Sequence, residues 1–91
     1  MNTLRDEKIK QITERIATAN HIPFNAVSTT AAIDSAGMHI VDVTISIRPG
    51  ASFDFFRDGR SSRTVSEVIQ KVADEGDERF AIVHYEGERA P

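Results

Sequence analysis

The chain has 91 residues, of which 40% are apolar, and its formal net charge is −3. This length suits one compact domain covering residues 1–91 and leaves no room for a second hydrophobic core, while the acidic balance argues against a general binder of polyanions. There is no cysteine, which excludes disulfides and thiolate metal sites and favours a reducing, cytoplasmic location. No segment approaches the ~20 apolar residues of a membrane span, so we expect no contact with a membrane.

The first segment predicts an amphipathic helix over residues 4–19. Thr3, with Asp6 three residues later, is a capping signal, and apolar residues then recur at helical spacing. The residues of this apolar stripe are Ile9, Ile12, Ile16 and Ala19. Asn20 favours termination, and Pro23 prevents the helix from continuing. Because the stripe is narrow, the helix is expected to cover its neighbour from one side only.

Two strands are predicted next, over residues 25–33 and 39–47. The first is rich in β-branched and small residues, and the second alternates apolar and polar side chains without a break. Between them, residues 34–37 read Asp-Ser-Ala-Gly, which is the residue preference of a type I turn. The alternation in the second strand predicts that it is buried on one face only.

A third strand is predicted over residues 52–56, after a proline-glycine turn. A change of one residue in the length of a hairpin loop moves every side chain of a strand to its other face. A three-residue connection over 49–51 places Phe53 and Phe55 beside the apolar face of the preceding strand, whereas a two-residue connection places them on its polar face. We therefore predict the three-residue loop, with a glycine-assisted bulge, and Phe56 then points away from the core.

The second helix is predicted to begin at a capping box formed by Thr64 and Glu67 and to end at Gly76. Its apolar stripe consists of Val65, Val68, Ile69, Val72 and Ala73. The spacing of this stripe is helical throughout, so the helix is expected to pack one face against the sheet.

The last predicted strand, over residues 79–85, is apolar on both faces. We expect Phe80 and Ile82 to face the helices. The opposite face then carries Ala81, Val83 and Tyr85. The tail from about residue 87 is expected to fray.

Together these elements predict an α+β fold, a two-layer sandwich in the order α-β-β-β-α-β. The strands at 25–33, 39–47 and 52–56 form an antiparallel meander, the C-terminal strand runs parallel to the first and third of them, and both helices cover one face. Pairing of the last strand beside the first or beside the third is left open. The order of helix, three strands and helix resembles that of the double-stranded RNA-binding domain, which also carries basic residues at the start of its second helix. This chain departs from that pattern by its further strand, its acidic charge and the lack of a lysine pair near Arg63 and Thr64.

Basic residues gather between the predicted third strand and the second helix. Residues 48–63 hold four arginines and two aspartates, whereas residues 73–91 hold six acidic and two basic residues. Backbone N–H groups at a helix N-terminus attract anions, and nearby arginines and hydroxyls add donors. The candidate contacts for an anion or a partner are Arg57, Arg60, Ser61, Ser62 and Arg63. The alternative is a solvated turn, because Glu67 faces the same helix end and the chain lacks a full phosphate-loop motif.

A second candidate surface is the face of the last strand that is turned away from the helices. The candidate interface residues are Phe56, Ala81, Val83 and Tyr85. An apolar patch on a polar face often marks a contact with another chain, although scattered exposed apolar residues are ordinary. We expect self-association through this face or through an open edge of the sheet.

The residue pattern predicts neither a metal site nor a catalytic site. His39 and Asp42 are three apart on a strand, so their side chains take opposite faces. His21 and His84 meet only if the tertiary structure brings them together. The two aspartates that flank the arginines have no nucleophile at a recognised spacing. We therefore expect no cofactor and no enzymatic activity.

The leading hypothesis is a small, non-enzymatic accessory module that binds protein, as a homodimer or as a regulator of a larger assembly. The alternative is a nucleic-acid or phosphate-binding module that uses the basic loop at residues 57–64. A small enzyme is the third class, and it would require a deep pocket lined by titratable groups.

Overall fold

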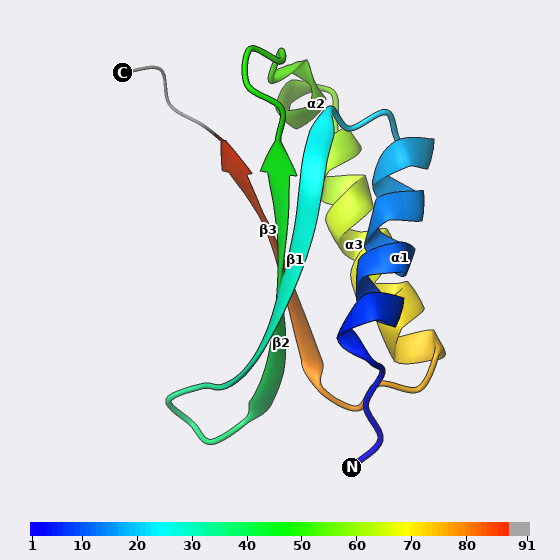
Figure 1. Ribbon diagram of the computed structural model, residues 1–91, viewed down its shortest axis with the longest axis vertical. Helices are drawn as coiled ribbons and strands as arrows, with labels where there is room; N and C mark the ends of the chain where they lie inside the picture. The colour runs from blue at the N-terminus through cyan, green and yellow to red at the C-terminus, as the bar shows by residue number, and fades with distance from the viewer. Residues whose placement is uncertain (88–91) are drawn as a thin grey trace.

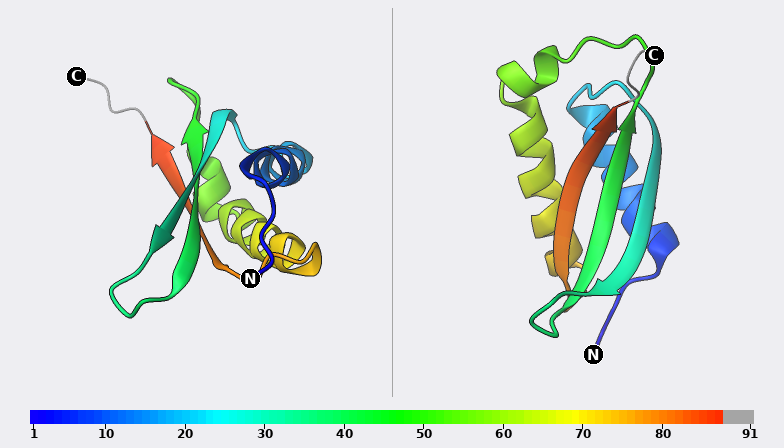
Figure 2. Two further views of the ribbon diagram at one scale, coloured as in Figure 1. Left: turned by 60° about the horizontal axis from the view of Figure 1, so that its bottom comes forward. Right: turned by 90° about the vertical axis from the view of Figure 1, so that its left-hand side faces the viewer.

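A three-stranded sheet with helices packed on one of its faces makes up the computed structural model, which describes residues 1–87 (Figure 1). In chain order the elements are α1 (Asp6–Ala19), β1 (Phe24–Ile33), β2 (His39–Ile47), α2 (Asp54–Arg57), α3 (Arg60–Asp74) and β3 (Phe80–Gly87). The right-hand view of Figure 2 looks on to the sheet with α1 and α3 behind it, so the near face of the sheet is uncovered. The predicted α+β, two-layer fold is confirmed. Gly87, where the tail was expected to begin fraying, still belongs to β3, and the rest of that tail lies outside the described residues.

The strand order is β1-β2-β3, with β1 antiparallel to β2 and β3 parallel to β2. The hairpin turn between β1 and β2 forms where it was predicted. There, the Gly37 N–H donates to the Asp34 carbonyl over 3.0 Å, and Gly37 has a φ of 82°. The prediction that the last strand runs parallel to the first is wrong, because β3 pairs directly with β2 and follows its direction.

Residues 52–56 do not form the predicted third strand; the chain passes through them into the short helix α2. It first turns, with the Ala51 N–H donating to the Arg48 carbonyl over 3.1 Å. Gly50 in this turn has a φ of 79°, a left-handed conformation that glycine adopts without strain. The predicted meander, and with it the element order that resembles the double-stranded RNA-binding domain, is therefore wrong.

The burial of the three phenylalanines in this segment explains why the predicted loop and strand do not form. Helical spacing buries Phe55 completely, with its ring centroid 5.5 Å from that of Tyr85. Phe53 and Phe56 remain about half exposed. A strand after the predicted three-residue loop would have buried Phe53 together with Phe55. A five-residue segment is too short for its pattern to distinguish strand from helix, and packing decides between them here.

The core lies between the sheet and the helices. β2 contributes alternate residues that are all buried, namely Val41, Val43, Ile45 and Ile47. The helices and flanking strands supply Ile9, Ile12, Ala17, Val27, Phe55, Val68, Val72, Ala81 and Val83. Each fully buried aliphatic side chain of this kind contributes roughly 1.5–3 kcal/mol. The burial of one face of β2 agrees with the alternation in the sequence.

The ends of the helices agree with the sequence pattern better than their starts do. α1 begins at Asp6, with Arg5 in the N-cap position and no side-chain cap, so the predicted Thr3 cap is wrong. α3 ends at Asp74, and Gly76 follows with a φ of 103°, as the predicted glycine stop requires.

A buried ion pair forms in the turn between α3 and β3. Asp77 Oδ2 lies 2.7 Å from Arg79 Nη2, and neither side chain is more than 9% exposed. Asp77 also accepts the Leu4 N–H over 3.1 Å, and Arg79 donates to the Leu4 carbonyl over 3.3 Å. Beside them, the Glu78 N–H donates to the Asn2 carbonyl over 2.9 Å. The segment before α1 is therefore fixed against the turn before β3.

Replacing Phe55 by alanine is expected to lower the free energy of unfolding by about 3–5 kcal/mol, because it leaves a cavity in the core. Phe53→Ala and Phe56→Ala are matched controls, since their rings are half exposed, and their expected losses are below about 1.5 kcal/mol. Urea denaturation measures all three. Equal losses for Phe53→Ala and Phe55→Ala would contradict the helical phase of α2.

Asp77→Ala is expected to cost about 3–5 kcal/mol at neutral pH, because it leaves the Arg79 guanidinium buried without its partner. Burial raises the pKa of Asp77, but the hydrogen bonds from Arg79 and from the Leu4 N–H outweigh it and hold the pKa below its ordinary value. The stabilisation is therefore complete above the unfolded pKa of about 3.9 and is lost as pH falls through the folded pKa.

The measurement is the difference in unfolding free energy between wild type and Asp77→Ala, followed from about pH 5 to about pH 2. This difference should shrink toward low pH. Val72→Ala, which destabilises the core without removing a titratable group, is the control, and its cost should stay the same over this pH range. A constant difference for Asp77→Ala would contradict an ionised Asp77 in the folded chain.

Candidate functional site

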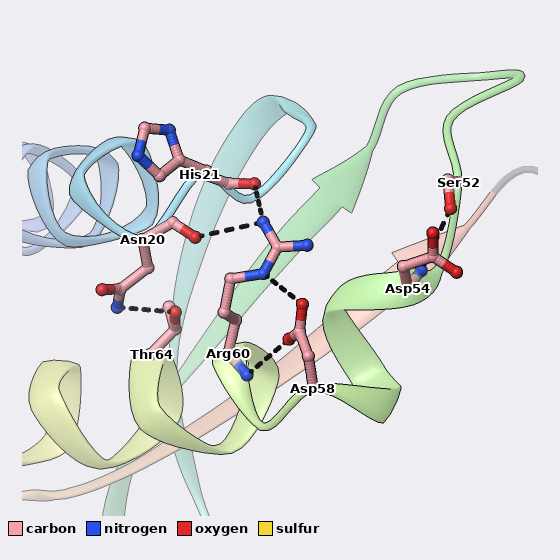
Figure 3. A network of polar contacts seen from close by, with 7 residues as sticks. All are labelled: Asn20, His21, Ser52, Asp54, Asp58, Arg60 and Thr64. Atoms are coloured by element: carbon pink, nitrogen blue, oxygen red, sulfur yellow. Dashed lines mark hydrogen bonds and ion pairs between the residues drawn. The ribbon is translucent and has the colours of Figure 1, made fainter.

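The arginine loop, residues 57–63, lies where α2 meets α3, beside the C-terminus of α1 (Figure 3). Arg57 ends α2, and Gly59, with a φ of 86°, precedes α3. The other predicted contact residues, from Arg60 to Arg63, form the first turn of α3 rather than a loop.

Arg60 is engaged with the C-terminus of α1. Its Nη1 donates to the His21 carbonyl over 2.8 Å and to the Asn20 carbonyl over 3.5 Å (Figure 3). Its Nε donates to Asp58 Oδ2 over 2.7 Å. α1 has no basic residue in its own last turn, so this guanidinium supplies the positive charge that complements the negative end of the helix dipole. Arg60 therefore has a structural role.

The chain reversal at the end of α1 exposes the carbonyls that Arg60 uses. His21 has a left-handed φ of 56°, and its N–H donates to the Thr18 carbonyl over 3.1 Å. The Ile22 N–H donates to the Ala17 carbonyl over 2.9 Å. This pair of bonds is a Schellman motif, which ends the helix and here buries Ile22. The motif does not use the carbonyls of Asn20 and His21, which accept the hydrogen bonds from Arg60.

The predicted capping box at Thr64 and Glu67 is wrong, because both residues lie inside α3. Their side chains bind Asn20 of α1 instead. Asn20 Nδ2 donates to Thr64 Oγ1 over 2.9 Å and to Glu67 Oε1 over 2.8 Å. Together with Arg60, these bonds tether the end of α1 to the first turns of α3.

The N-terminus of α3 already holds an anion from its own chain. Asp58 Oδ1 accepts the Arg60 N–H over 3.0 Å, and this bond, helped by the Arg60 side chain, lowers the pKa of Asp58. A carboxylate in this position competes with an external anion for the same positive end of the helix. Arg57, Ser62 and Arg63 are exposed, and within residues 1–87 neither of these two arginines forms an ion pair.

The predicted interface residues lie mostly on the helix-facing side of β3. Ala81 and Val83 are buried in the core. Tyr85 is half-buried and donates its hydroxyl to the Ser61 carbonyl over 2.9 Å, and burial raises the pKa of this tyrosine. Phe56 is 47% exposed and packs against the Tyr85 ring at a centroid distance of 5.2 Å. The predicted faces of β3 were wrong because the strand is apolar on both, and the packing of α3 selects between them.

The helices leave one face of the sheet uncovered (Figure 2). The strand register places the other side chains of the strands on this face, in rows that cross the three strands. From the hairpin end the rows are Ala32, Ile40 and Phe80; Thr30, Asp42 and Ile82; Ser28, Thr44 and His84; and Ala26, Ser46 and Glu86. Phe80 is 63% exposed and Ile82 is 40% exposed. We refer to Ile40, Phe80 and Ile82 as the apolar patch. The open face thus changes from apolar at the hairpin end to polar at the other.

The polar part of this face contains a contact that the sequence pattern did not reveal. His84 Nε2 lies 2.5 Å from Asp42 Oδ1 and 3.0 Å from Thr44 Oγ1. Both partners meet the same ring nitrogen, whereas a nucleophile relay requires the carboxylate and the hydroxyl on opposite nitrogens of the ring. The arrangement therefore does not match a catalytic triad. Assigning the faces of β3 correctly would have brought these residues together.

Two further features bear on ligand binding, namely the grouping of metal-binding side chains and a groove between α1 and α3. Within residues 1–87, no group of three or more metal-binding side chains comes together. An open groove with a volume of about 440 Å³ runs between α1 and α3. Its lining residues are Lys8, Ile12, Arg15, Ile16, Glu67, Gln70, Lys71, Asp74 and Glu75. Three of these side chains are basic and three are acidic, so the groove does not concentrate one sign of charge.

Comparisons with protein-family models, with curated proteins and with solved structures gave no match. The candidate surfaces therefore rest on the geometry of this chain. In the part of the chain that the structure describes, no helix combines the length and the apolar character needed to cross a bilayer.

Arg60→Ala is expected to lower the free energy of unfolding by about 1.5–3 kcal/mol, because it removes charge-assisted hydrogen bonds to the end of α1. Arg63→Ala, an exposed arginine in the same helical turn, is the matched control, with an expected change within about 0.5 kcal/mol. Urea denaturation of both variants provides the measurement. Similar losses for the two would count against the structural role of Arg60.

Proposed function

We propose that this chain is a small, non-enzymatic protein-binding module that self-associates, and that its sheet makes the contact. The observation that carries the proposal is the open sheet, which has an uncovered face with an exposed apolar patch and free edges on its outer strands. Contiguous apolar surface on an otherwise polar face marks contacts with other chains, because its exposure to water is unfavourable.

The outer strands support the same proposal. β1 and β3 each have one side without a neighbouring strand in the described structure. The unpaired N–H and C=O groups of an edge strand are a template for another strand. A second copy of the chain is a partner that is always available, and closed dimers are the commonest symmetric assembly.

Nucleic-acid or phosphate binding by residues 57–64 has less support. Arg60 and Asp58 bind each other, and Arg60 also binds the end of α1. Of the three arginines in this loop, Arg57 and Arg63 are the two that form no ion pair within residues 1–87 and can contact an external anion. An enzymatic role also has less support, since the contact at His84 lacks the geometry of a relay.

The proposal predicts a dimer, with a mass near twice the chain mass of 10.1 kDa, by light scattering after size exclusion at high micromolar concentration. Dilution is expected to shift the mass toward the monomer. The association should persist at about 0.5 M salt, whereas attraction between the basic loop and acidic regions would be screened. A mass that stays at the monomer value over the whole range would contradict the proposal.

A further inference from the structure

The free edge of β1 presents backbone groups from alternate residues. At the hairpin end, the Asp34 N–H donates to the Met38 carbonyl over 2.9 Å. From there the register between β1 and β2 is regular as far as Ala26, so the residues that hydrogen-bond to β2 alternate along β1. Those with N–H and C=O groups toward β2 are Ala26, Ser28, Thr30 and Ala32. Those with the same groups directed outward are Val27, Thr29, Ala31 and Ile33.

β1 lacks the devices that natural edge strands use against unwanted pairing. Over Phe24–Ile33 there is no charged residue, no proline and no glycine. Its register shift lies at the very start, between Phe24 and Ala26, so the rest of the edge is unbroken. Protected edges carry lysines, prolines or bulges along the strand. β3, the other outer strand, carries His84 and Glu86. The β1 edge is therefore the better template for another strand.

One apolar side chain on this strand has no cover. Ile33 has the same strand parity as the buried Val27, yet it is 63% exposed. Figure 1 shows the reason, since the end of the β1–β2 hairpin extends beyond the helices. A strand paired along β1 would bring side chains beside this residue.

We propose that β1 pairs antiparallel with β1 of a second copy, about a two-fold axis beside Thr30, a geometry that rests on the proposed self-association. With this axis, Val27 of one copy lies opposite Ile33 of the other, and Thr29 lies opposite Ala31. All the outward-directed residues then pair, which gives about eight backbone hydrogen bonds at two per pair. Ile33 gains an apolar neighbour in this register.

The neutrality of β1 favours a second copy as the occupant. Self-pairing brings equivalent segments together, so a charged strand would place like charges near one another, but β1 has none. A two-fold contact of this kind closes with two chains. The resulting sheet has the order β3-β2-β1-β1-β2-β3, with all helices on one side and both apolar patches on the other.

Charge changes at Thr30 test this register. The Thr30 side chain is exposed, and beside a two-fold axis it lies opposite its own copy, with Cβ atoms about 4.5–5.5 Å apart. Thr30→Lys and Thr30→Glu are each expected to raise the dimer dissociation constant at least about tenfold, because like charges meet. An equimolar mixture of the two should form heterodimers with near wild-type affinity, because opposite charges meet. Light scattering and native mass spectrometry measure both effects.

Two further variants sharpen the test. Ser46→Lys makes the same change from hydroxyl to lysine on the same face, but on the central strand, and should leave the dissociation constant unchanged. Ala31→Pro removes an N–H that points outward and spares the bonds to β2, so it should give a folded monomer. It also serves if the Thr30 variants fail to fold, as judged by circular dichroism.

The possible outcomes separate edge pairing from self-association in general. A wild-type dimer that is unaffected by Thr30→Lys and Ala31→Pro overturns edge pairing and leaves the proposed function standing. Dissociation by Phe80→Ser in that case assigns the contact to the apolar patch. A wild-type chain that stays monomeric overturns both proposals.

Discussion

The central strand β2 is the element on which the rest of the structure depends. It is hydrogen-bonded on both sides, to β1 and to β3, and its alternate residues are buried. Because β3 occupies its second side, residues 52–56 find no place beside β2 and enter α2 instead. The parallel pairing of β3 also requires a long crossover, which α2 and α3 provide. The helices pack on the apolar face of β2, because only that face can bury their apolar stripes.

Polar tethers then close the helical layer at both ends. Arg60 and Asn20 join α1 to α3 at one end, and Asp77 with Arg79 holds the segment before α1 at the other. These contacts are made by polar residues that, from the sequence pattern alone, are expected to face solvent or to bind a ligand. None of the large apolar side chains that are exposed within residues 1–87 belongs to α1 or α3. Phe53 and Phe56 are exposed at α2, whereas Ile33, Phe80 and Ile82 are exposed on the sheet, which also has the free backbone edges.

A partner paired along the β1 edge leaves the open face of the sheet free to bind another protein. Pairing along β1 satisfies backbone groups at one side of the sheet and leaves the apolar patch of each copy, on β2 and β3, uncovered. A dimer built in this way presents two patches on one continuous face. Self-association and binding of a further protein can therefore use different parts of the same sheet, and neither involves the arginine loop.

Much of the fold follows from local patterns. The unbroken alternation of β2, the turn at residues 34–37 and the helical stripes in α1 and α3 have strong periods of their own, so the sequence alone predicted a two-layer α+β fold with the helices on one face. Each of these features depends on residues only a few positions apart. The arginines were expected in a loop before the second helix, but Arg57 ends α2 and Arg63 lies in the first turn of α3.

The tertiary structure decided what had no local preference. Residues 52–56 alternate polar and apolar side chains over only a few positions, which is too short a stretch to favour strand over helix. β3 is apolar on both faces, so packing selected the helix in one case and the buried face in the other. The contacts of Arg60 with His21, of Thr64 with Asn20, and of His84 with Asp42 and Thr44 join residues 39 to 44 positions apart in the chain, too far to be read from spacing. The sequence by itself therefore determined the elements and their amphipathic faces, while long-range pairing determined which polar residues are used internally and which surface remains open.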